Sequence, residues 1–182
     1  EGTLVDEWVT LKDDSTMMSC IVDALAAKGY TQTGADTGYI SEINGIKEKD
    51  ASKNSGWMGT LNDWFTSEGF AKYTVANGKL KSGDEIAVQH TCNLGADIGG
   101  SFDTSDKSLK AIALSAGELI PAFSSDVHNY TMILPADVTA LTVTPTASNK
   151  QNRVRIYAGG TEYGRKDAIP VQVGTVITEG RQ

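Results

Sequence analysis

One stretch of the chain, residues 109–134, constrains the fold more than any other. It leads from an apolar segment through Gly117 to a corner at Pro121, and enters a second apolar segment at Tyr130. Proline fixes φ at about −65° and has no amide N–H, so it suits a corner where no ladder hydrogen bond is needed. Phe123 and Tyr130 are large apolar bodies that can fill the space between two sheets. The stretch therefore predicts strands of a β-sandwich, whose side chains build a core and not a catalyst.

The remainder of the second half continues this pattern of short strands. Apolar or alternating segments recur at residues 130–134, 140–145, 153–157 and 169–173, separated by short turns of Asp, Asn, Gly and Pro. Regular short strands with frequent turns are typical of a β-sandwich. We therefore expect residues 108–182 to form one all-β domain.

This half of the chain resembles the bacterial cadherin-like β-sandwich domain in the Gly117 turn, the corner at residues 121–124 and the strand entered at Tyr130. The resemblance implies an immunoglobulin/cadherin-like sandwich in an exported bacterial protein. That family usually continues past the equivalent of Val176-Ile177 to a closing strand, so we expect the last strand to be missing here. An unpaired edge invites pairing, and we expect it to be covered by C-terminal residues of the chain or to pair with a neighbour.

A helix is predicted in the first half, between the capping residues Asp13-Asp14-Ser15 and Gly29. Short polar side chains favour the start of a helix, and glycine tolerates the left-handed conformation that ends one. The apolar residues between them fall on one stripe at helical spacing: Met17, Met18, Ile21, Val22 and Leu25. This spacing predicts a helix of about three and a half turns.

Strands are predicted around this helix at residues 4–11, 39–43, 56–62 and 86–92. Asn44-Gly45, which follows the second of them, suits the positive φ values of a tight hairpin turn. In the last strand Ile86, Val88, His90 and Cys92 alternate onto one face, so Cys92 is expected on the apolar side of the sheet. One helix laid across a small mixed sheet is an α+β arrangement of β-grasp type.

Residues 1–95 also resemble a bacterial domain family of unknown function, DUF4430, which is similar to the C-terminal domain of transcobalamin and intrinsic factor. The resemblance rests on Met17 to Tyr30, Gly38 to Gly45, Gly56-Trp57-Met58 and Gly83 to Ile86. It implies a β-grasp-like domain over residues 1–95 and makes a corrinoid the named small-molecule ligand. The chain departs from the family at Asn62-Asp63, where many members have Asn-Gly, and its stretch from Trp64 to Leu80 is longer than usual.

Residues 96–107 are expected to form a linker, because the surrounding stretch is rich in Gly and Ser and poor in apolar residues. It carries Asp97, Asp103 and Asp106, and carboxylates are the oxygen ligands that Ca²⁺ prefers. Their spacing does not match the EF-hand loop. We interpret them as solvated turn residues and predict no metal site, with calcium as the alternative.

The two cysteines, Cys20 and Cys92, lie far apart and show no metal-ligand spacing. Cys20 falls on the flank of the predicted helix and Cys92 on the apolar face of a strand, so a disulfide between helix and sheet is geometrically reasonable. It would close a loop of about 70 residues and stabilise the chain by about 4 kcal/mol. Two buried free thiols are the alternative, and the sequence does not decide between them.

Several functional classes are excluded by composition and motifs. A net charge of −7 and the lack of a Lys/Arg run argue against nucleic acid, and no apolar run approaches the roughly 18 residues of a membrane span. A signal peptide is absent from this sequence, so we expect it to have been removed or to lie outside it. His90 and His128 have no convincing nucleophile partner. We predict no enzyme, no catalytic residue and no cofactor.

Binding remains as the function, with Tyr39, Trp57, Trp64 and Phe65 as the candidate ligand-binding residues. Aromatic rings give large contact areas at small entropic cost. Trp57 is better explained as a residue of the small core, but the adjacent pair Trp64-Phe65 cannot both face inward from an extended segment. We predict a bacterial cell-surface or extracellular module for adhesion to a protein or glycan, with the sandwich as spacer. The alternatives are corrinoid capture and a purely structural spacer.

Overall fold

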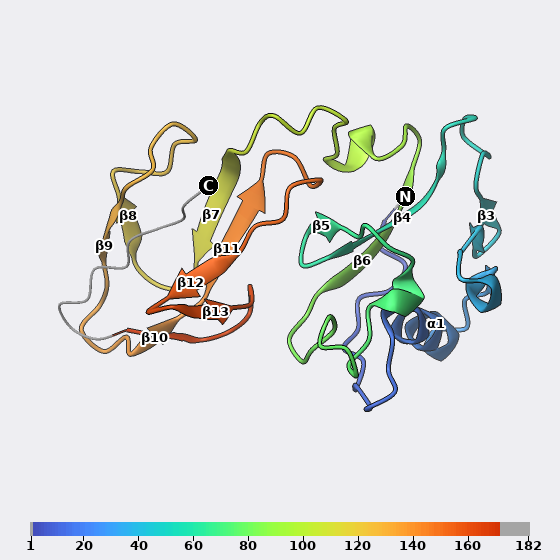
Figure 1. Ribbon diagram of the computed structural model, residues 1–182, viewed down its shortest axis with the longest axis horizontal. Helices are drawn as coiled ribbons and strands as arrows, with labels where there is room; N and C mark the ends of the chain where they lie inside the picture. Colours follow the sequence, from blue (N-terminus) through green and yellow to red (C-terminus); the bar gives the residue numbers. More distant parts are fainter. Residues whose placement is uncertain (1, 172–182) are drawn as a thin grey trace. The chain divides into compact units, whose positions relative to one another are not determined.

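Short β-strands make up most of the regular structure of the described residues, together with one α-helix (Figure 1). The computed structural model of the chain describes residues 2–171. Contacts between residues divide the chain into two units. The first unit comprises the residues up to Leu61 together with Phe65–Gly100. The second comprises Asn62–Trp64 and the residues from Ser101 onward. Each unit is described by itself.

The first unit contains two three-stranded sheets, in the orders β1-β2-β3 and β5-β4-β6. Its elements are α1 (Met17–Ala27), β1 (Gln32–Thr33), η1 (Ala35–Thr37), β2 (Glu42–Ile43), β3 (Ile46–Lys47), β4 (Gly56–Leu61), β5 (Trp64–Phe65), η2 (Phe70–Lys72), β6 (Ile86–Thr91) and η3 (Ala96–Ile98).

Helix α1 begins one residue later than the predicted caps. The N-cap is Thr16, whose hydroxyl accepts from the Ser19 amide at 3.0 Å, while the Ser19 hydroxyl accepts from the Thr16 amide at 2.9 Å. Such a reciprocal pair satisfies two amide groups that the first turn leaves unbonded. Gly29, with φ of 73°, follows the helix in the left-handed conformation, as predicted. The buried face of α1 consists of Met17, Met18, Cys20, Ile21 and Leu25.

The predicted turn at Asn44-Gly45 is confirmed. Both residues have positive φ, 49° and 82°, and they join β2 to β3 in an antiparallel hairpin. The predicted strands at 56–62 and 86–92 are confirmed as β4 and β6, each one residue shorter, and paired antiparallel from Gly56 opposite Thr91 to Leu61 opposite Ile86.

The predicted strand at residues 4–11 is wrong. Residues 2–11 form no backbone hydrogen bond with any other residue in the described part of the chain, so they belong to no sheet. The segment keeps part of a strand-like alternation, because Val5, Val9 and Leu11 are half-buried while Leu4, Asp6, Trp8 and Thr10 are exposed; Glu7, which is also exposed, interrupts it.

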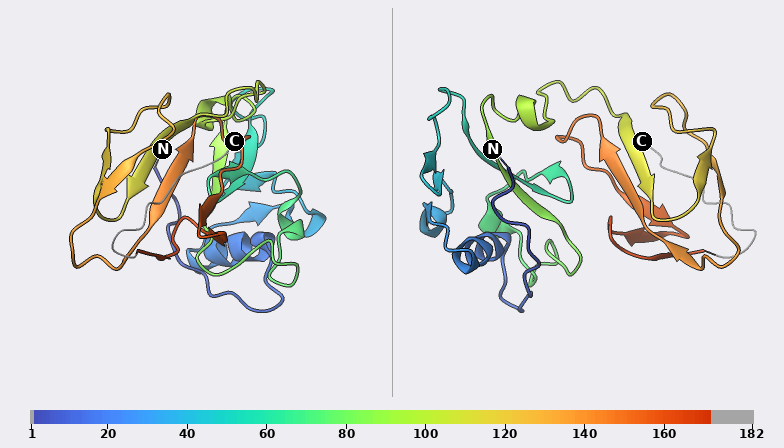
Figure 2. Two further views of the ribbon diagram at one scale, coloured as in Figure 1. Left: turned by 60° about the vertical axis from the view of Figure 1, so that its left-hand side comes forward. Right: turned by 180° about the vertical axis from the view of Figure 1, so that it is seen from behind.

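The second unit consists of paired short strands. Its elements are β7 (Leu109–Leu114), β8 (Glu118–Ile120), β9 (Thr131–Ile133), β10 (Ala140–Leu141), β11 (Val143–Ala147), β12 (Ile156–Ala158), β13 (Thr161–Tyr163) and β14 (Ile169–Pro170). The pairs are β7 with β11, β8 with β9, β10 with β14 and β12 with β13. Figure 2 shows β7 and β11, the longest pair, side by side. The arrangement is consistent with a cadherin-like β-sandwich.

The Pro121 corner joins β8 to β9 with Phe123 stacked on Tyr130 at a ring-centroid distance of 6.2 Å. Tyr130 donates its hydroxyl hydrogen to the Ser124 carbonyl at 2.7 Å and accepts from the Ser124 amide at 3.0 Å. Both rings are only half-buried, so they brace the corner and do not fill the centre of a core as expected. The most buried apolar side chains of this unit are Leu141 and Ile169. The stretch around Val176-Ile177, where the expected sheet edge would be completed, lies outside the described residues.

Candidate functional site

The histidines occupy different environments. The His90 ring nitrogen Nε2 lies 3.2 Å from the Lys47 carbonyl oxygen, and the ring meets the Trp57 indole edge-on at a centroid distance of 5.1 Å. His128 lies exposed in the loop before β9. Among residues 2–171, no group of three or more His, Cys, Asp or Glu side chains is arranged to hold a metal ion.

Two of the four predicted binding residues are core residues. Trp57 is 9% exposed, and its indole N–H donates to the Ile46 carbonyl at 3.0 Å, which ties β4 to the β2–β3 hairpin. Phe65 is 3% exposed. Because both rings are enclosed by their own fold, neither presents a surface to a ligand.

Trp64 belongs to a different unit from the other three aromatic residues. It groups with the second unit, where its indole N–H donates to the Gln151 carbonyl at 3.1 Å and the Arg153 guanidinium lies 5.5 Å from the ring centroid. The ring is half-buried by these contacts. Trp64 and Phe65 thus differ in burial, as expected for neighbours on an extended segment.

Tyr39 is the predicted binding residue that the fold leaves accessible. Its side chain is 50% exposed, and its hydroxyl donates to Glu48 Oε2 at 2.8 Å. This hydrogen bond lowers the pKa of the Glu48 carboxyl, and the nearby Lys49 ammonium adds to the effect. Partial burial, with the Glu48 carboxylate beside it, raises the pKa of Tyr39. At neutral pH the pair is therefore a neutral phenol bonded to a carboxylate, and the ring is held in one orientation.

The loop before β2 presents Tyr39 by means of a glycine. Gly34 has φ of 97°, and a Cβ at this position would lie 2.2 Å from the Tyr39 carbonyl oxygen. The Tyr39 amide in turn donates to the Gly34 carbonyl at 3.1 Å. Only glycine permits both the backbone angle and the close approach, so Gly34 fixes the backbone of the loop at the residue that carries the ring.

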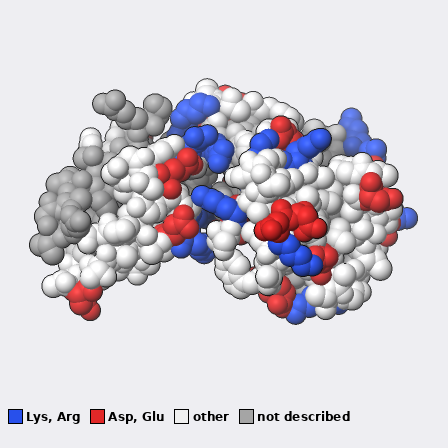
Figure 3. Space-filling view, turned by 60° about the horizontal axis from the view of Figure 1, so that its bottom comes forward, with Lys and Arg blue, Asp and Glu red and all other residues white. Residues whose placement is uncertain are grey.

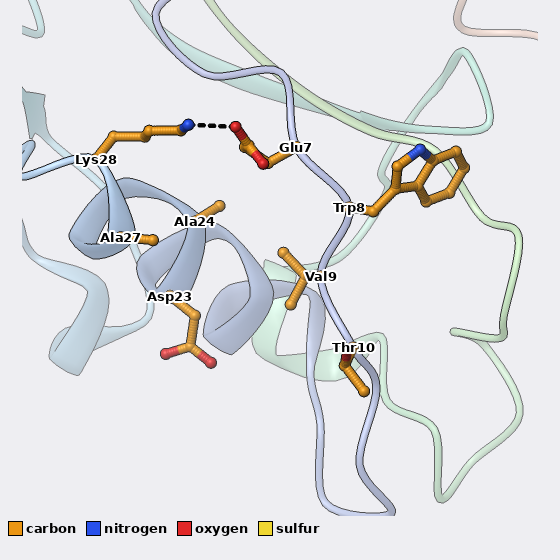
Figure 4. Close-up of a pocket in the computed structure, with 8 residues that line it drawn as sticks. All are labelled: Glu7, Trp8, Val9, Thr10, Asp23, Ala24, Ala27 and Lys28. Atoms are coloured by element: carbon orange, nitrogen blue, oxygen red, sulfur yellow. Dashed lines mark ion pairs between the residues drawn. The ribbon is translucent and has the colours of Figure 1, made fainter.

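A groove lies elsewhere on the first unit, between the extended residues 7–10 and helix α1 (Figure 4). Its volume is about 300 Å³, and it is lined by Glu7, Trp8, Val9, Thr10, Asp23, Ala24, Ala27 and Lys28. Lys28 forms an ion pair with Glu7, which joins the two walls, while the Trp8 ring points away from α1 and is 77% exposed. This groove was not predicted from the sequence. Its one sequence signal is the pair of small residues Ala24 and Ala27 at helical spacing.

The cysteines are not bonded to each other in the structure. Cys20 is buried in α1, whereas Cys92 is exposed just after β6, so neither the predicted disulfide nor the alternative of two buried thiols describes both residues. The expected inward position of Cys92 is wrong because β6 ends at Thr91 and the alternation stops there. Burial, followed by the negative charge of Asp23, raises the pKa of the Cys20 thiol.

The three aspartates considered for calcium each bond to their own loop. Asp97 accepts from the Thr91 hydroxyl and from the Cys92 amide at 2.7 Å. Asp103 accepts from the Ser105 amide at 2.9 Å, and Asp106 accepts from the Ser108 amide at 2.8 Å. These are turn-forming bonds. Acidic and basic side chains are interspersed on the face that Figure 3 shows.

Two family models match the chain, in the order that the sequence resemblances indicate. Residues 14–89 match a domain of unknown function (DUF4430), and residues 108–179 match the cadherin-like beta sandwich domain. The chain therefore carries a DUF4430 domain followed by a cadherin-like β-sandwich domain. Neither is a known enzyme family.

The chain is also similar to a "Putative membrane protein" of Evansella cellulosilytica, with 27% identity over 104 residues. The matched region covers 54% of this chain but only 16% of that protein. No solved structure matches the chain. Within the described residues, no helix is long and apolar enough to cross a membrane.

Proposed function

We propose that the chain is a non-enzymatic, exported surface module of a bacterial protein, in which the first domain binds an extracellular ligand and the cadherin-like domain serves as spacer. The two domain families support a surface or membrane-associated location, as does the similarity to a relative whose name describes a membrane protein. The ligand class we favour is a glycan or a glycosylated protein of the surroundings.

The observation that carries this proposal is the accessible ring of Tyr39. An aromatic ring that is half exposed and fixed in orientation loses little entropy when a sugar ring or an apolar side chain stacks on it. The bond to Glu48 provides this fixation, and Glu48 is itself anchored, because its amide donates to the Ser41 carbonyl at 2.8 Å. The core of the first unit consists of other side chains, so its folding does not require an exposed phenol at this position.

A glycan array and a mucin-binding assay with the wild type and Tyr39→Ala test this proposal. The matched control is Tyr157→Ala in the second unit, because Tyr157 is 49% exposed and its hydroxyl also donates to a glutamate, Glu162, at 3.3 Å. We expect Tyr39→Ala to weaken binding by about tenfold or more, which is about 1.4 kcal/mol. We expect Tyr157→Ala to have no effect. Equal effects of the two substitutions would contradict the assignment to Tyr39.

Two other outcomes separate the alternatives. A shift in the cobalamin absorption spectrum on titration with the chain would support corrinoid capture instead. We do not favour this function, because the groove of about 300 Å³ is at the small end of the range for small-molecule sites. If the chain binds none of the glycans, mucin or cobalamin, the result would support a purely structural spacer.

We also propose that the first domain is β-grasp-like. In support, α1 contacts β6 of the β5-β4-β6 sheet and buries one apolar face. This arrangement would leave the β2–β3 hairpin and the Tyr39 loop at the periphery of the domain, where a ligand can reach them.

A further inference from the structure

We propose that the groove between residues 7–10 and helix α1 binds an extended, basic peptide segment of a partner protein. This site is separate from Tyr39 and does not depend on the function proposed for it. Three observations support the assignment: a strand-like segment without a ladder, a groove beside it and the charge of its walls.

The segment Leu4–Leu11 has part of the side-chain pattern of a strand but, among residues 2–171, none of its ladder hydrogen bonds. Val5, Val9 and Leu11 are half-buried and the even-numbered side chains are exposed, as is Glu7, yet no backbone N–H or C=O of residues 2–11 bonds to another described backbone group. A strand with unpaired amides and carbonyls is a template for another strand. The missing component is therefore an extended backbone, which a peptide supplies and a small molecule does not.

The groove offers room for the side chains of such a peptide. The α1 wall carries the small residues Ala24 and Ala27, and Val9 points toward it from the segment (Figure 4). Alternate side chains of a strand lie on one face, so every second residue of the bound peptide would rest on these methyl groups. A volume of about 300 Å³ suits a few side chains and not a folded domain.

The charge around the groove selects a basic peptide. The segment and the turn after it carry Asp6, Glu7, Asp13 and Asp14 against a single Lys12. Lys28 is neutralised by Glu7, whereas Asp23 at the groove and Asp6 beside it make no ion pair with any described residue. The exposed face of Trp8 adds a surface that attracts cations. A second copy of the chain fits less well, because each copy carries a net charge of −7.

The test uses the full chain and a nine-residue peptide of alternating Lys and Val, with its Glu-Val counterpart and a proline-interrupted Lys-Val peptide as comparisons. Binding is measured by calorimetry, and its location by amide hydrogen exchange. We expect the Lys-Val peptide to bind and to protect the amides of residues 4–11, and we expect the other two peptides not to bind. No binding of the Lys-Val peptide at about 1 mM overturns the proposal, as does equal binding of the Glu-Val peptide.

Two alanines on the last turn of α1 provide a matched pair of variants. Ala27 lines the groove and Ala26 does not, although both are exposed. We expect Ala27→Leu to fill the groove and weaken peptide binding by about tenfold or more, and Ala26→Leu to leave it unchanged. Equal affinities of the two variants overturn the proposal. A dimer of the chain alone that Ala27→Leu dissociates would assign the groove to a second copy and also overturn it. Tyr39→Ala should not change peptide binding, which separates this site from the proposed glycan site.

Discussion

Substitution of Gly59 by alanine tests how tightly the first domain is packed. Gly59 is buried on β4, and a Cβ there would lie 2.4 Å and 2.5 Å from two ring atoms of Phe70 and 3.2 Å from the methyl group of Met17. The Phe70 ring would have to retreat by roughly 1 Å to restore ordinary contact, and the methyl group of the fully buried Met17 would also be crowded.

Overpacking of this kind costs about 1–3 kcal/mol. Alanine also reduces the conformational entropy of the unfolded chain, which stabilises the folded state by about 0.5–1 kcal/mol. Gly56 on the same strand is the control, because its nearest neighbours would lie 3.5 Å and 3.8 Å from the new Cβ. We therefore expect Gly59→Ala to be less stable than Gly56→Ala by about 2 kcal/mol.

The assay is amide hydrogen exchange of β4 and β6 in the full chain, which reports the opening of this domain alone. A difference of about 2 kcal/mol corresponds to roughly 30-fold faster exchange in Gly59→Ala than in Gly56→Ala. In a Phe70→Ala background the penalty of Gly59→Ala should shrink, because the clashing ring is gone. Equal exchange in the two glycine variants, or an undiminished penalty without the Phe70 ring, would refute the packing argument.

Other predictions concern single interactions. Trp57→Phe should lower the free energy of unfolding by about 1 kcal/mol, measured by the same exchange experiment, because the bond to the Ile46 carbonyl is lost. The bonds from the Cys92 amide and the Thr91 hydroxyl hold the pKa of Asp97 below its ordinary value. The stabilisation from Asp97 is therefore complete above the unfolded-state pKa of about 3.9 and is lost as pH falls through the lower folded-state pKa. We would measure this loss as the amide exchange protection of residues 92–97 at a series of pH values. The Asp97→Asn variant, which lacks the carboxyl group, is the pH-independent comparison. A thiol reagent at neutral pH should label Cys92 rapidly and Cys20 only after unfolding, and rapid labelling of Cys20 would contradict its burial.

Local conformational rules predicted the features that depend on one or two residues. Asn44-Gly45 specifies positive φ values at both turn positions, and Gly29 permits the left-handed residue after a helix. The apolar stripe of α1 and the alternation in β6 likewise appear directly in the sequence. The two turns need no partner from elsewhere in the chain, whereas β6 is a strand because β4 pairs with it.

Features that depend on a distant partner were not predictable in the same way. The residues 4–11 have strand composition, but a strand exists only when a ladder forms, and no described segment provides it. Tyr39 and Trp57 were both candidates as aromatic residues, and the tertiary fold exposes the first and buries the second. The groove combines an extended segment with the face of a helix, so periodicity within either one does not reveal it.

The turn after β6 also limits the growth of the sheet. Thr91 is 1% exposed, and its hydroxyl donates to Asp97 while it accepts from the amides of Asn93 and Gly95 at 3.1 Å and 2.7 Å. These amides are therefore occupied at the point where β6, an edge strand among the described residues, would otherwise extend. Edge strands are the places where β proteins pair edge to edge with other chains. A single threonine and a single aspartate thus set the length of this edge, and with it the number of backbone groups that β6 offers to another strand.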